Sequence, residues 1–228
     1  AEGAENLLEG VPPIFDSGRN DSGNGSIMRA APVPIAFHLN AKEAMEVAAL
    51  QSWATHPGQD AAACCRFVAF FVVRALASHK ARRDPGADPR SFLSAAVDDF
   101  LAAVDDLEGM QNLRALLLCE PPSATEQNWD WKQPVLLTTE AILARWKLPN
   151  AQYNGHPVIP DYFGAYCMDG LAMALWALWH STDFTGAVLR AVNLLGDADT
   201  VGAVAGQLAG ALYGFSGILA DAWGGACV

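Results

Sequence analysis

Residues 196–200 read Gly-Asp-Ala-Asp-Thr and place two carboxylates and a hydroxyl within four residues, directly before a predicted helix. Such an all-oxygen ligand set suits the hard cations Mg²⁺, Mn²⁺ or Ca²⁺ rather than zinc. The alternative is helix capping, because Asp and Thr are common N-caps and carboxylates are favourable at the positive end of a helix. One residue suffices as a cap, however, and two carboxylates this close repel each other unless a cation lies between them.

A second unusual stretch, Asp21 to Arg29, reads DSGNGSIMR. Consecutive small residues with two glycines leave backbone N–H groups free to face an anion, as phosphate-binding loops do. The stretch matches neither the Walker A nor the dinucleotide-binding fingerprint. The alternative is a surface turn that uses Asn-Gly chemistry, and the pattern alone leaves both interpretations open.

Two single side chains complete the candidate chemistry. His56, in Thr-His-Pro, ends the first strongly helical segment, where it is either a cap or a ligand contact. Tyr166 begins a long apolar segment that contains Leu171 and Leu175, and by pattern alone it would be a core residue.

Composition narrows the possible partners. The chain of 228 residues is long enough for one sizeable domain, is 52% hydrophobic, and carries 14 basic against 25 acidic residues for a formal charge of -11. This charge argues against nucleic-acid binding, which needs a basic surface. No uninterrupted apolar run approaches the roughly 18 residues of a membrane span, and no signal peptide is recognisable. Five cysteines without a C-x-x-C pair favour a reducing compartment, so we expect a cytoplasmic protein without a membrane partner.

The elements that must position these residues are predicted to be helical. The first forty residues read as turn and loop, and the segment 120–134 is too irregular to assign. Apolar residues at helical spacing predict helices at about 40–56 with an Asn40 capping box, 58–78, 89–107, 138–146, 165–181, 184–195 and 200–215. Alternating strand patterns are almost absent, so the sequence predicts an all-helical domain.

Glycine recurs at every fourth residue of the last helix: Gly202, Gly206, Gly210 and Gly214. Each glycine in a helix interior costs about 1 kcal/mol relative to alanine. We interpret the stripe as a smooth face that lets a neighbouring backbone approach closely in a tightly packed central helix.

Four collinear blocks make the chain similar to a known family: SGNGSIMRAAPVPIAF (22–37), ATHPGQDAAACCRF (54–67), YCMDGLAMALWAL (166–178) and NLLGDADTVGAVAGQLAGALYG (193–214). Together they resemble the ADP-ribosylglycohydrolases, which include the glycohydrolase that reactivates ADP-ribosylated dinitrogenase reductase. The resemblance implies an all-α fold, a compact orthogonal helical bundle, in which residues 1–228 form one domain equivalent to the C-terminal two-thirds or so of the family fold.

The resemblance also implies a reaction, cofactors and site residues. The expected reaction is metal-dependent hydrolysis that removes ADP-ribose from a modified protein side chain or a small ADP-ribosyl conjugate. Two Mg²⁺ ions, or sometimes Mn²⁺, would lie in a cleft. The expected metal ligands are Asp197, Asp199 and Thr200; the expected substrate-binding residues are Gly23, Asn24, Gly25, Ser26 and Met28 around the diphosphate and ribose, His56 against the same groups, and Tyr166 near the adenine. Arg29 is expected to anchor the loop.

The chain also departs from the family pattern. The GDALG-like segment and the TDDT motif, which supply the other metal ligands and the acidic catalytic group, are both absent, so the catalytic residue stays unknown. Three side chains cannot fill two shells of about six oxygens each. Gly170 stands where many relatives have threonine.

Three functions therefore remain open. The chain is part of a longer hydrolase, or a module that binds ADP-ribose without cleaving it, or a structural relative of the kind recruited as a lens crystallin. An absent N-terminal part would leave apolar surface uncovered, which predicts self-association or a partner protein.

Overall fold

The computed structural model describes residues 21–81, 88–104, 110–122, 129–134, 152–153, 156–157 and 164–220. Apart from two strands of two residues each, the regular structure of this part of the chain is helical, which confirms the all-α prediction. The expected helix 138–146 lies outside the described residues.

The elements follow in chain order. A 3₁₀ turn, η1 (Asn24–Ser26), precedes the short helix α2 (Pro32–Ala36). The helices of the first half are then α3 (Ala41–Trp53), α4 (Gln59–Ala81), α5 (Pro89–Ala103) and α6 (Gln111–Leu118). Strands β1 (Gln152–Tyr153) and β2 (His156–Pro157) pair antiparallel. The last helices are α8 (Cys167–Trp179), α9 (Phe184–Val192) and α10 (Ala198–Ala220).

Local capping chemistry sets several of these boundaries. The Asn40 side chain accepts a hydrogen bond from the Glu43 backbone N–H at 3.2 Å and donates to the Glu43 carboxylate, so the predicted capping box is confirmed. Asp88 caps α5, and Pro89 occupies its first turn. This helix ends at Ala103, four residues before the predicted end, because Val104 is extended with φ −96° and ψ 106°.

Three short elements escaped the sequence analysis. The prediction of loop for the first forty residues is wrong for η1 and α2, and α6 was not predicted. Helices of five to eight residues contain too few turns to show a clear period, and α2 begins with two prolines in its first three residues.

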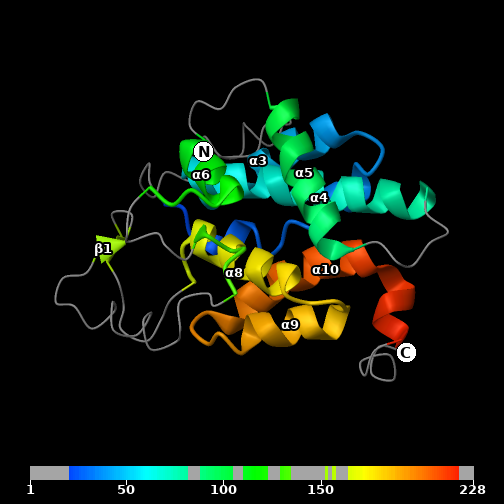
Figure 1. The fold of residues 1–228 in the computed structure, drawn as a ribbon. Coiled ribbons are helices and arrows are strands. Elements are labelled where there is room, and N and C mark those ends of the chain that lie inside the picture. Colours follow the sequence, from blue (N-terminus) through cyan, green and yellow to red (C-terminus); the bar gives the residue numbers. More distant parts are fainter. Residues whose placement is uncertain are drawn as a thin grey trace.

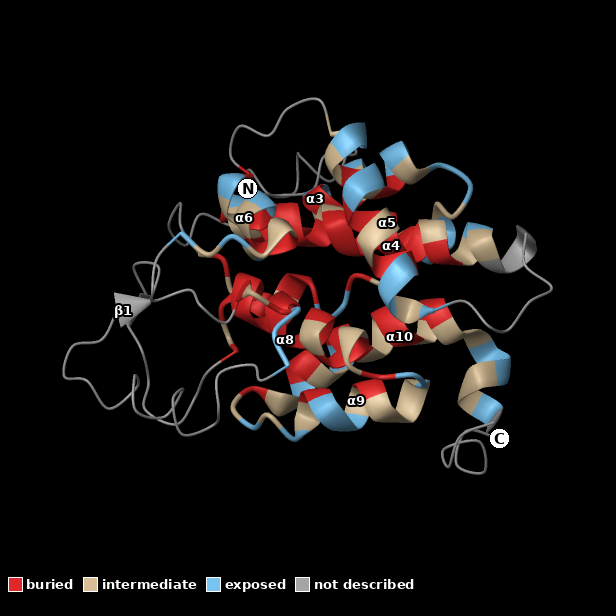
Figure 2. Cartoon of the chain, viewed as in Figure 1, coloured by how far each residue is buried: buried red, intermediate tan, exposed pale blue. Residues whose placement is uncertain are grey.

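The helices form two layers (Figure 1). Helices α3, α4, α5 and α6 make one layer, and α8, α9 and α10 make the other, with α4 in contact with both α8 and α10. Buried residues gather where the two layers meet, and nearly every residue of α8 is buried (Figure 2). Exposed and half-buried residues alternate on α9 and on the last turns of α10 (Figure 2).

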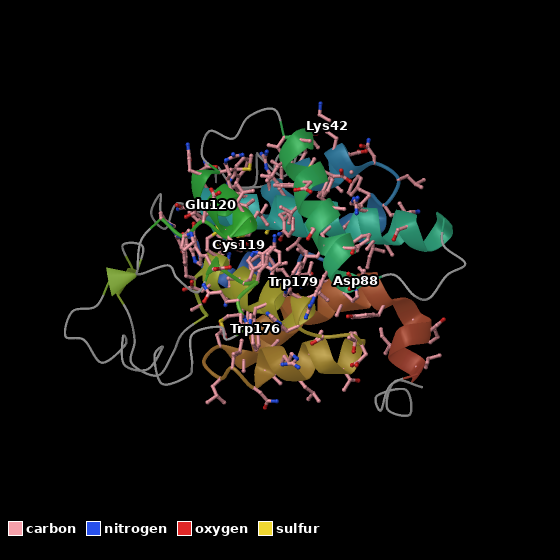
Figure 3. The ribbon with its side chains drawn as sticks, in the orientation of Figure 1. Lys42, Asp88, Cys119, Glu120, Trp176 and Trp179 are labelled. Atoms are coloured by element: carbon pink, nitrogen blue, oxygen red, sulfur yellow. The ribbon has the colours of Figure 1, made fainter. Side chains whose placement is uncertain are left out.

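Aromatic side chains fill much of the space between the elements. Phe67 of α4 meets Phe100 of α5 edge to face with ring centroids 5.3 Å apart. Trp131 meets Trp179 of α8 in the same manner at 5.4 Å. Trp176 and Trp179 lie on the last turns of α8 (Figure 3), and the Trp176 indole N–H donates to the Gln133 carbonyl at 3.1 Å. These contacts attach the 129–134 segment to the core of the second layer.

Two helices are longer and more apolar than the sequence analysis allowed. The windows Gln59–Ser78 and Ala198–Leu219 reach the length and mean hydropathy of membrane-spanning helices, at 1.7 and 1.3. The buried share of the first window is 72%, as expected for a core helix, and that of the second is 33%. Length and composition alone therefore do not exclude a membrane-spanning helix. The apolar composition of α4 is explained by its burial inside the fold.

The glycine stripe of α10 does not form the close helix contact that we predicted from its spacing. A Cβ at Gly202 would lie 2.8 Å from Val192 of α9, which is a close approach. A Cβ at Gly206 would meet nothing within 4 Å, and one at Gly210 would only touch Phe184 at 3.9 Å. Gly214 breaks the helix with φ 69° and ψ 176°. The prediction is right for Gly202 and wrong for the rest of the stripe.

The glycines allow a paired test of close approach. A Cβ at Gly58 would lie 1.9 Å from Ser22 Oγ and 2.5 Å from the Asp21 carbonyl oxygen, so Gly58→Ala should lower the free energy of unfolding by roughly 1–3 kcal/mol. Gly206→Ala should raise it by about 0.5–1 kcal/mol, because the added methyl meets open space and alanine favours the helix. Urea unfolding of the two variants measures both changes. A Gly58→Ala protein as stable as wild type would contradict the packing described here.

Candidate functional site

The GNGS loop, defined here as residues 22–28, lies against the start of α8. Gly23 forms an antiparallel bridge with Tyr166, more than 140 residues later in the chain. The Asn24 N–H donates to the Ala165 carbonyl at 2.8 Å, and the Cys167 N–H donates to the Ser22 carbonyl at 3.0 Å. Backbone pairing on both sides of Gly23 thus places the loop independently of its side chains.

The other side of the loop is held by α3. Ser52 Oγ donates to Ser26 Oγ at 2.9 Å, and the Gln51 amide donates to the Ser26 carbonyl at 3.1 Å. Arg29 donates from Nε to Gln51 Oε1 at 3.2 Å and from Nη2 to the Thr55 hydroxyl. The expectation that Arg29 anchors the loop is confirmed, and Ser26 is fully buried beneath it.

His56 lies directly over the two glycines of the loop. A Cβ on Gly25 would lie 2.8 Å from His56 Cε1, and one on Gly23 would lie 3.3 Å from His56 Cδ2. A Cβ at Gly25 would displace the imidazole, and one at Gly23 would require a smaller shift, so glycine at these positions lets the imidazole approach the loop backbone closely. Burial lowers the pKa of His56 from its ordinary 6.5, Asp21 opposes this shift, and the Arg29 charge adds to it. The neutral imidazole is favoured in the folded protein.

The acidic turn lies at the start of α10. Leu195 and Gly196 both have a φ of 67°, in the left-handed region, and the chain then enters the helix. This conformation is unusual for leucine. Asp197 is 5% exposed and Thr200 is 7% exposed, whereas Asp199 is exposed. The turn thus presents one buried and one solvent-facing carboxylate.

Folding brings the GNGS loop and the acidic turn together. The Asn24 side-chain amide donates to the Asp197 carboxylate and, at 2.7 Å, to the Gly164 carbonyl. The Thr200 hydroxyl lies 3.6 Å from the sulfur of Met28. Two motifs about 170 residues apart in the sequence are therefore in direct contact.

The donor set of the acidic turn fits a hard cation. Asp197, Asp199 and Thr200 offer carboxylate and hydroxyl oxygens, the donors that Mg²⁺ and Mn²⁺ prefer. Across the described ranges, the single ion pair joins Arg74 to Asp99, so no basic side chain there neutralises the buried Asp197. No group of three or more His, Cys, Asp or Glu side chains in the same ranges is placed to hold a metal ion, so this turn supplies only part of a coordination shell.

Tyr166 has a different environment from the one expected for a residue that stacks on adenine. It is 9% exposed, and its hydroxyl donates to the Asp60 carboxylate at 2.5 Å. Asn112 of α6 donates to the same oxygen of Asp60 at 3.0 Å, which joins α4, α6 and α8. Burial raises the pKa of the phenol. The stacking role stays a prediction, and the burial of the ring argues against it.

Sequence reasoning missed three residues around the site. The Gln207 amide donates to the carbonyls of Ile27 and Met28 at 3.1 and 2.8 Å and so attaches α10 to the loop. Asp60 accepts from Tyr166, and Asp169, 4% exposed, accepts from the Trp129 indole N–H at 3.2 Å. A polar residue within an otherwise apolar helix is a sign in the sequence that its side chain has a partner. The sequence does not identify that partner, because it lies on another element.

A separate groove of about 400 Å³ runs along α8 and α9, lined by Trp176, Gly186, Leu189, Arg190, Asn193 and Leu194. None of these residues belongs to the GNGS loop or to the acidic turn. The candidate chemistry described above therefore lies outside this groove.

Known proteins share both the sequence and the fold. The family model described as ADP-ribosylglycohydrolase matches residues 1–227. The chain is 31% identical over 212 residues to a protein named ADP-ribosylarginine hydrolase Tri1 from Pseudomonas putida (strain GB-1). This alignment covers 93% of this chain and 44% of that protein. A protein of the same name from Serratia proteamaculans (strain 568) is 53% identical over 53 residues, or 23% of this chain and 14% of that one.

A solved structure described as an ADP-ribosylglycohydrolase-related protein complex has a TM-score of 0.57 and 27% sequence identity. The match covers 94% of this chain and 58% of that chain. The chain thus spans less than half of the length of the curated relatives that it matches.

The lowered pKa of His56 predicts a pH-dependent stability. As the pH falls below about 6.5, His56 of the unfolded chain binds a proton more readily than His56 of the folded protein does. Acidification therefore lowers the free energy of unfolding. His56→Gln should lose less stability between about pH 7 and pH 5 than wild type does, as measured by urea unfolding. His180, whose pKa burial also lowers, should account for part of the remaining loss, so His56→Gln/His180→Gln should lose still less. An equal loss in wild type and His56→Gln would contradict this assignment.

Proposed function

This chain belongs to the ADP-ribosylglycohydrolase family, and from that premise we propose that it forms the ADP-ribose-binding and cation-binding part of a hydrolase that releases ADP-ribose from modified arginine. The proposed arginine acceptor rests on the names of the two relatives from Pseudomonas and Serratia. The proposed activity is that of a whole hydrolase, of which this chain supplies a part, because the matches cover 44% of the Pseudomonas relative and 14% of the Serratia relative.

One observation carries the proposal: the GNGS loop and the acidic turn meet. Asn24 of the loop donates to Asp197 of the turn, and Met28 of the loop contacts Thr200. A substrate with a diphosphate held by the loop would place its adjoining ribose next to the oxygens of the turn. This is the juxtaposition that a glycohydrolase needs, since the scissile bond joins that ribose to the acceptor.

The loop and His56 would hold the nucleotide. Arg29 donates a hydrogen bond to the Thr55 hydroxyl oxygen, which leaves the hydroxyl proton of Thr55 free to be donated in turn. Its acceptor is Nδ1 of His56, 2.8 Å away. The proton of the neutral imidazole is then on Nε2, beside Gly23 and Gly25. His56 would donate this hydrogen bond to a phosphate or ribose oxygen of the substrate. Glycine at both positions lets the ligand approach the backbone.

Asp197, Asp199 and Thr200 would provide oxygen ligands for Mg²⁺ or Mn²⁺. A bound cation supplies Lewis-acid chemistry, which polarises coordinated oxygens and lowers the pKa of bound water. The protein's own contribution is to keep Asp197 buried and oriented while Asp199 faces solvent. An acidic residue elsewhere in the longer protein would handle the proton of the departing acceptor.

A second candidate is an ADP-ribose-binding module that does not cleave its ligand. The acidic turn favours this candidate, because it supplies two carboxylates and a two-metal site needs more oxygen ligands than these. The described ranges also contain no larger acidic cluster that could complete such a site. The two candidates share the loop and differ in turnover.

Binding and turnover measurements test the proposal together. Calorimetry on this chain should detect binding of both Mn²⁺ and ADP-ribose. In the full-length protein that contains this chain, millimolar Mg²⁺ should support release of ADP-ribose from an ADP-ribosylated arginine substrate. Asp199→Ala should abolish this release, because it removes a ligand oxygen. Asp98→Ala, which removes an exposed carboxylate on α5, is the control and should retain full activity.

The outcomes separate the candidates. Binding of ADP-ribose without release favours the non-cleaving module. Release that persists in Asp199→Ala would show that the acidic turn is not the cation site. Failure to bind either ligand would exclude both candidates.

A further inference from the structure

The Asn24 side chain is buried and bonded within the protein. It is 7% exposed, and its amide donates to the Gly164 carbonyl and to the Asp197 carboxylate. The family resemblance placed Asn24 among the expected substrate-binding residues of the loop. Its two acceptors within the protein give it a different role from that of its glycine neighbours.

The hydrogen-bond partners determine which end of the amide faces Asp197. A main-chain carbonyl and a carboxylate both accept hydrogen bonds, so only the Nδ2 group, with its two protons, satisfies both. The Gly164 carbonyl lies close to the backbone of α8, since a Cβ on Gly170 would lie 3.1 Å from its oxygen. The amide is therefore held between two defined acceptors.

An amide is a suitable partner for a carboxylate that must bind a cation. Arginine or lysine would neutralise the charge of Asp197 and compete with a metal ion for it. The neutral amide of Asn24 satisfies one oxygen of the buried carboxylate and fixes its orientation while the negative charge remains available. Across the described part of the chain, Asp197 has this amide and no basic side chain as its partner.

The backbone of Asn24 is fixed as firmly as its side chain. Its N–H donates to the Ala165 carbonyl, and its own carbonyl accepts from the N–H groups of Ile27 and Met28. Gln207 also attaches the loop to α10 through the carbonyls of Ile27 and Met28, but no carboxylate contact of Gln207 accompanies these bonds. Asn24 and Gln207 thus join the same two elements, and Asn24 alone of the two contacts a carboxylate of the acidic turn.

We propose that Asn24 is a positioning residue for the cation site, which holds the Asp197 carboxylate in its binding orientation and so couples the GNGS loop to the metal. This inference rests on the proposed function, because it takes Asp197 as a metal ligand. It changes the role of Asn24 from a contact with the substrate to a partner of the ligand.

Cation affinity, measured with the whole chain and Mn²⁺ alone, tests the role without any assay of turnover. Asn24→Ala should weaken Mn²⁺ binding by roughly 10- to 100-fold, the usual effect of removing a group that orients a metal ligand. Gln207→Ala removes a different link between the loop and α10, one without a carboxylate, and should keep the Mn²⁺ affinity within about twofold of wild type. Calorimetry and electron paramagnetic resonance of free Mn²⁺ both measure this affinity.

Asn24→Asp provides a second readout that survives a failure of Asn24→Ala to fold. Two carboxylates would then face each other without a donor, so the melting temperature without metal should fall. Mn²⁺ should raise it by more than it raises that of wild type, because the cation relieves the repulsion.

Each result decides a separate point. Tight Mn²⁺ binding by wild type and equally tight binding by Asn24→Ala would overturn the positioning role and leave the proposed function intact. A melting temperature of Asn24→Asp that Mn²⁺ raises no more than that of wild type would likewise overturn it. Failure of wild type to bind Mn²⁺ would overturn both the cation site and this inference.

Discussion

A buried carboxylate with an amide as its partner organises the site. Asp197 directly precedes α10, is 5% exposed, and accepts a hydrogen bond from Asn24, while no basic side chain within the described ranges pairs with it. Burying an unpaired charge is expensive, so its neighbours must provide hydrogen bonds and leave room for a counter-charge. The Asn24 amide of the GNGS loop provides such a hydrogen bond, and the Gly164 carbonyl accepts from the same amide and holds it in place.

Close backbone approach is the second constraint. The loop lies against His56 and Gly58, and at both contacts a Cβ in place of the glycine hydrogen would lie close to a neighbouring atom. These contacts explain glycine at positions 23, 25 and 58 more directly than turn geometry does. The glycines of α10 show the contrast, because a Cβ added at Gly206 would meet no atom of another element within 4 Å and Gly214 ends the first part of the helix. Glycine spacing alone does not distinguish these cases.

Several features followed correctly from local sequence. The capping box of Asn40, the Asp88-Pro89 start of α5 and the helical segments around α4, α8, α9 and α10 depend on residues close in the chain, so their patterns are visible without tertiary contacts. The loop-anchoring role of Arg29 was also predicted and is confirmed by its bonds to α3. Elements of one or two turns, such as α2 and α6, were missed because their period is too short to detect.

By itself, the sequence determined the helical fold class, the main helices and two stretches with the right atoms for an anion and a cation. These properties depend on residue type and on spacings of a few residues. Only the tertiary structure decided which of those residues meet: Asn24 turns inward to Asp197, Tyr166 is buried against Asp60, and Gln207 holds the loop. Contacts between residues more than 100 positions apart depend on how the helices pack, and the helical period of one segment contains no information about its partner in another.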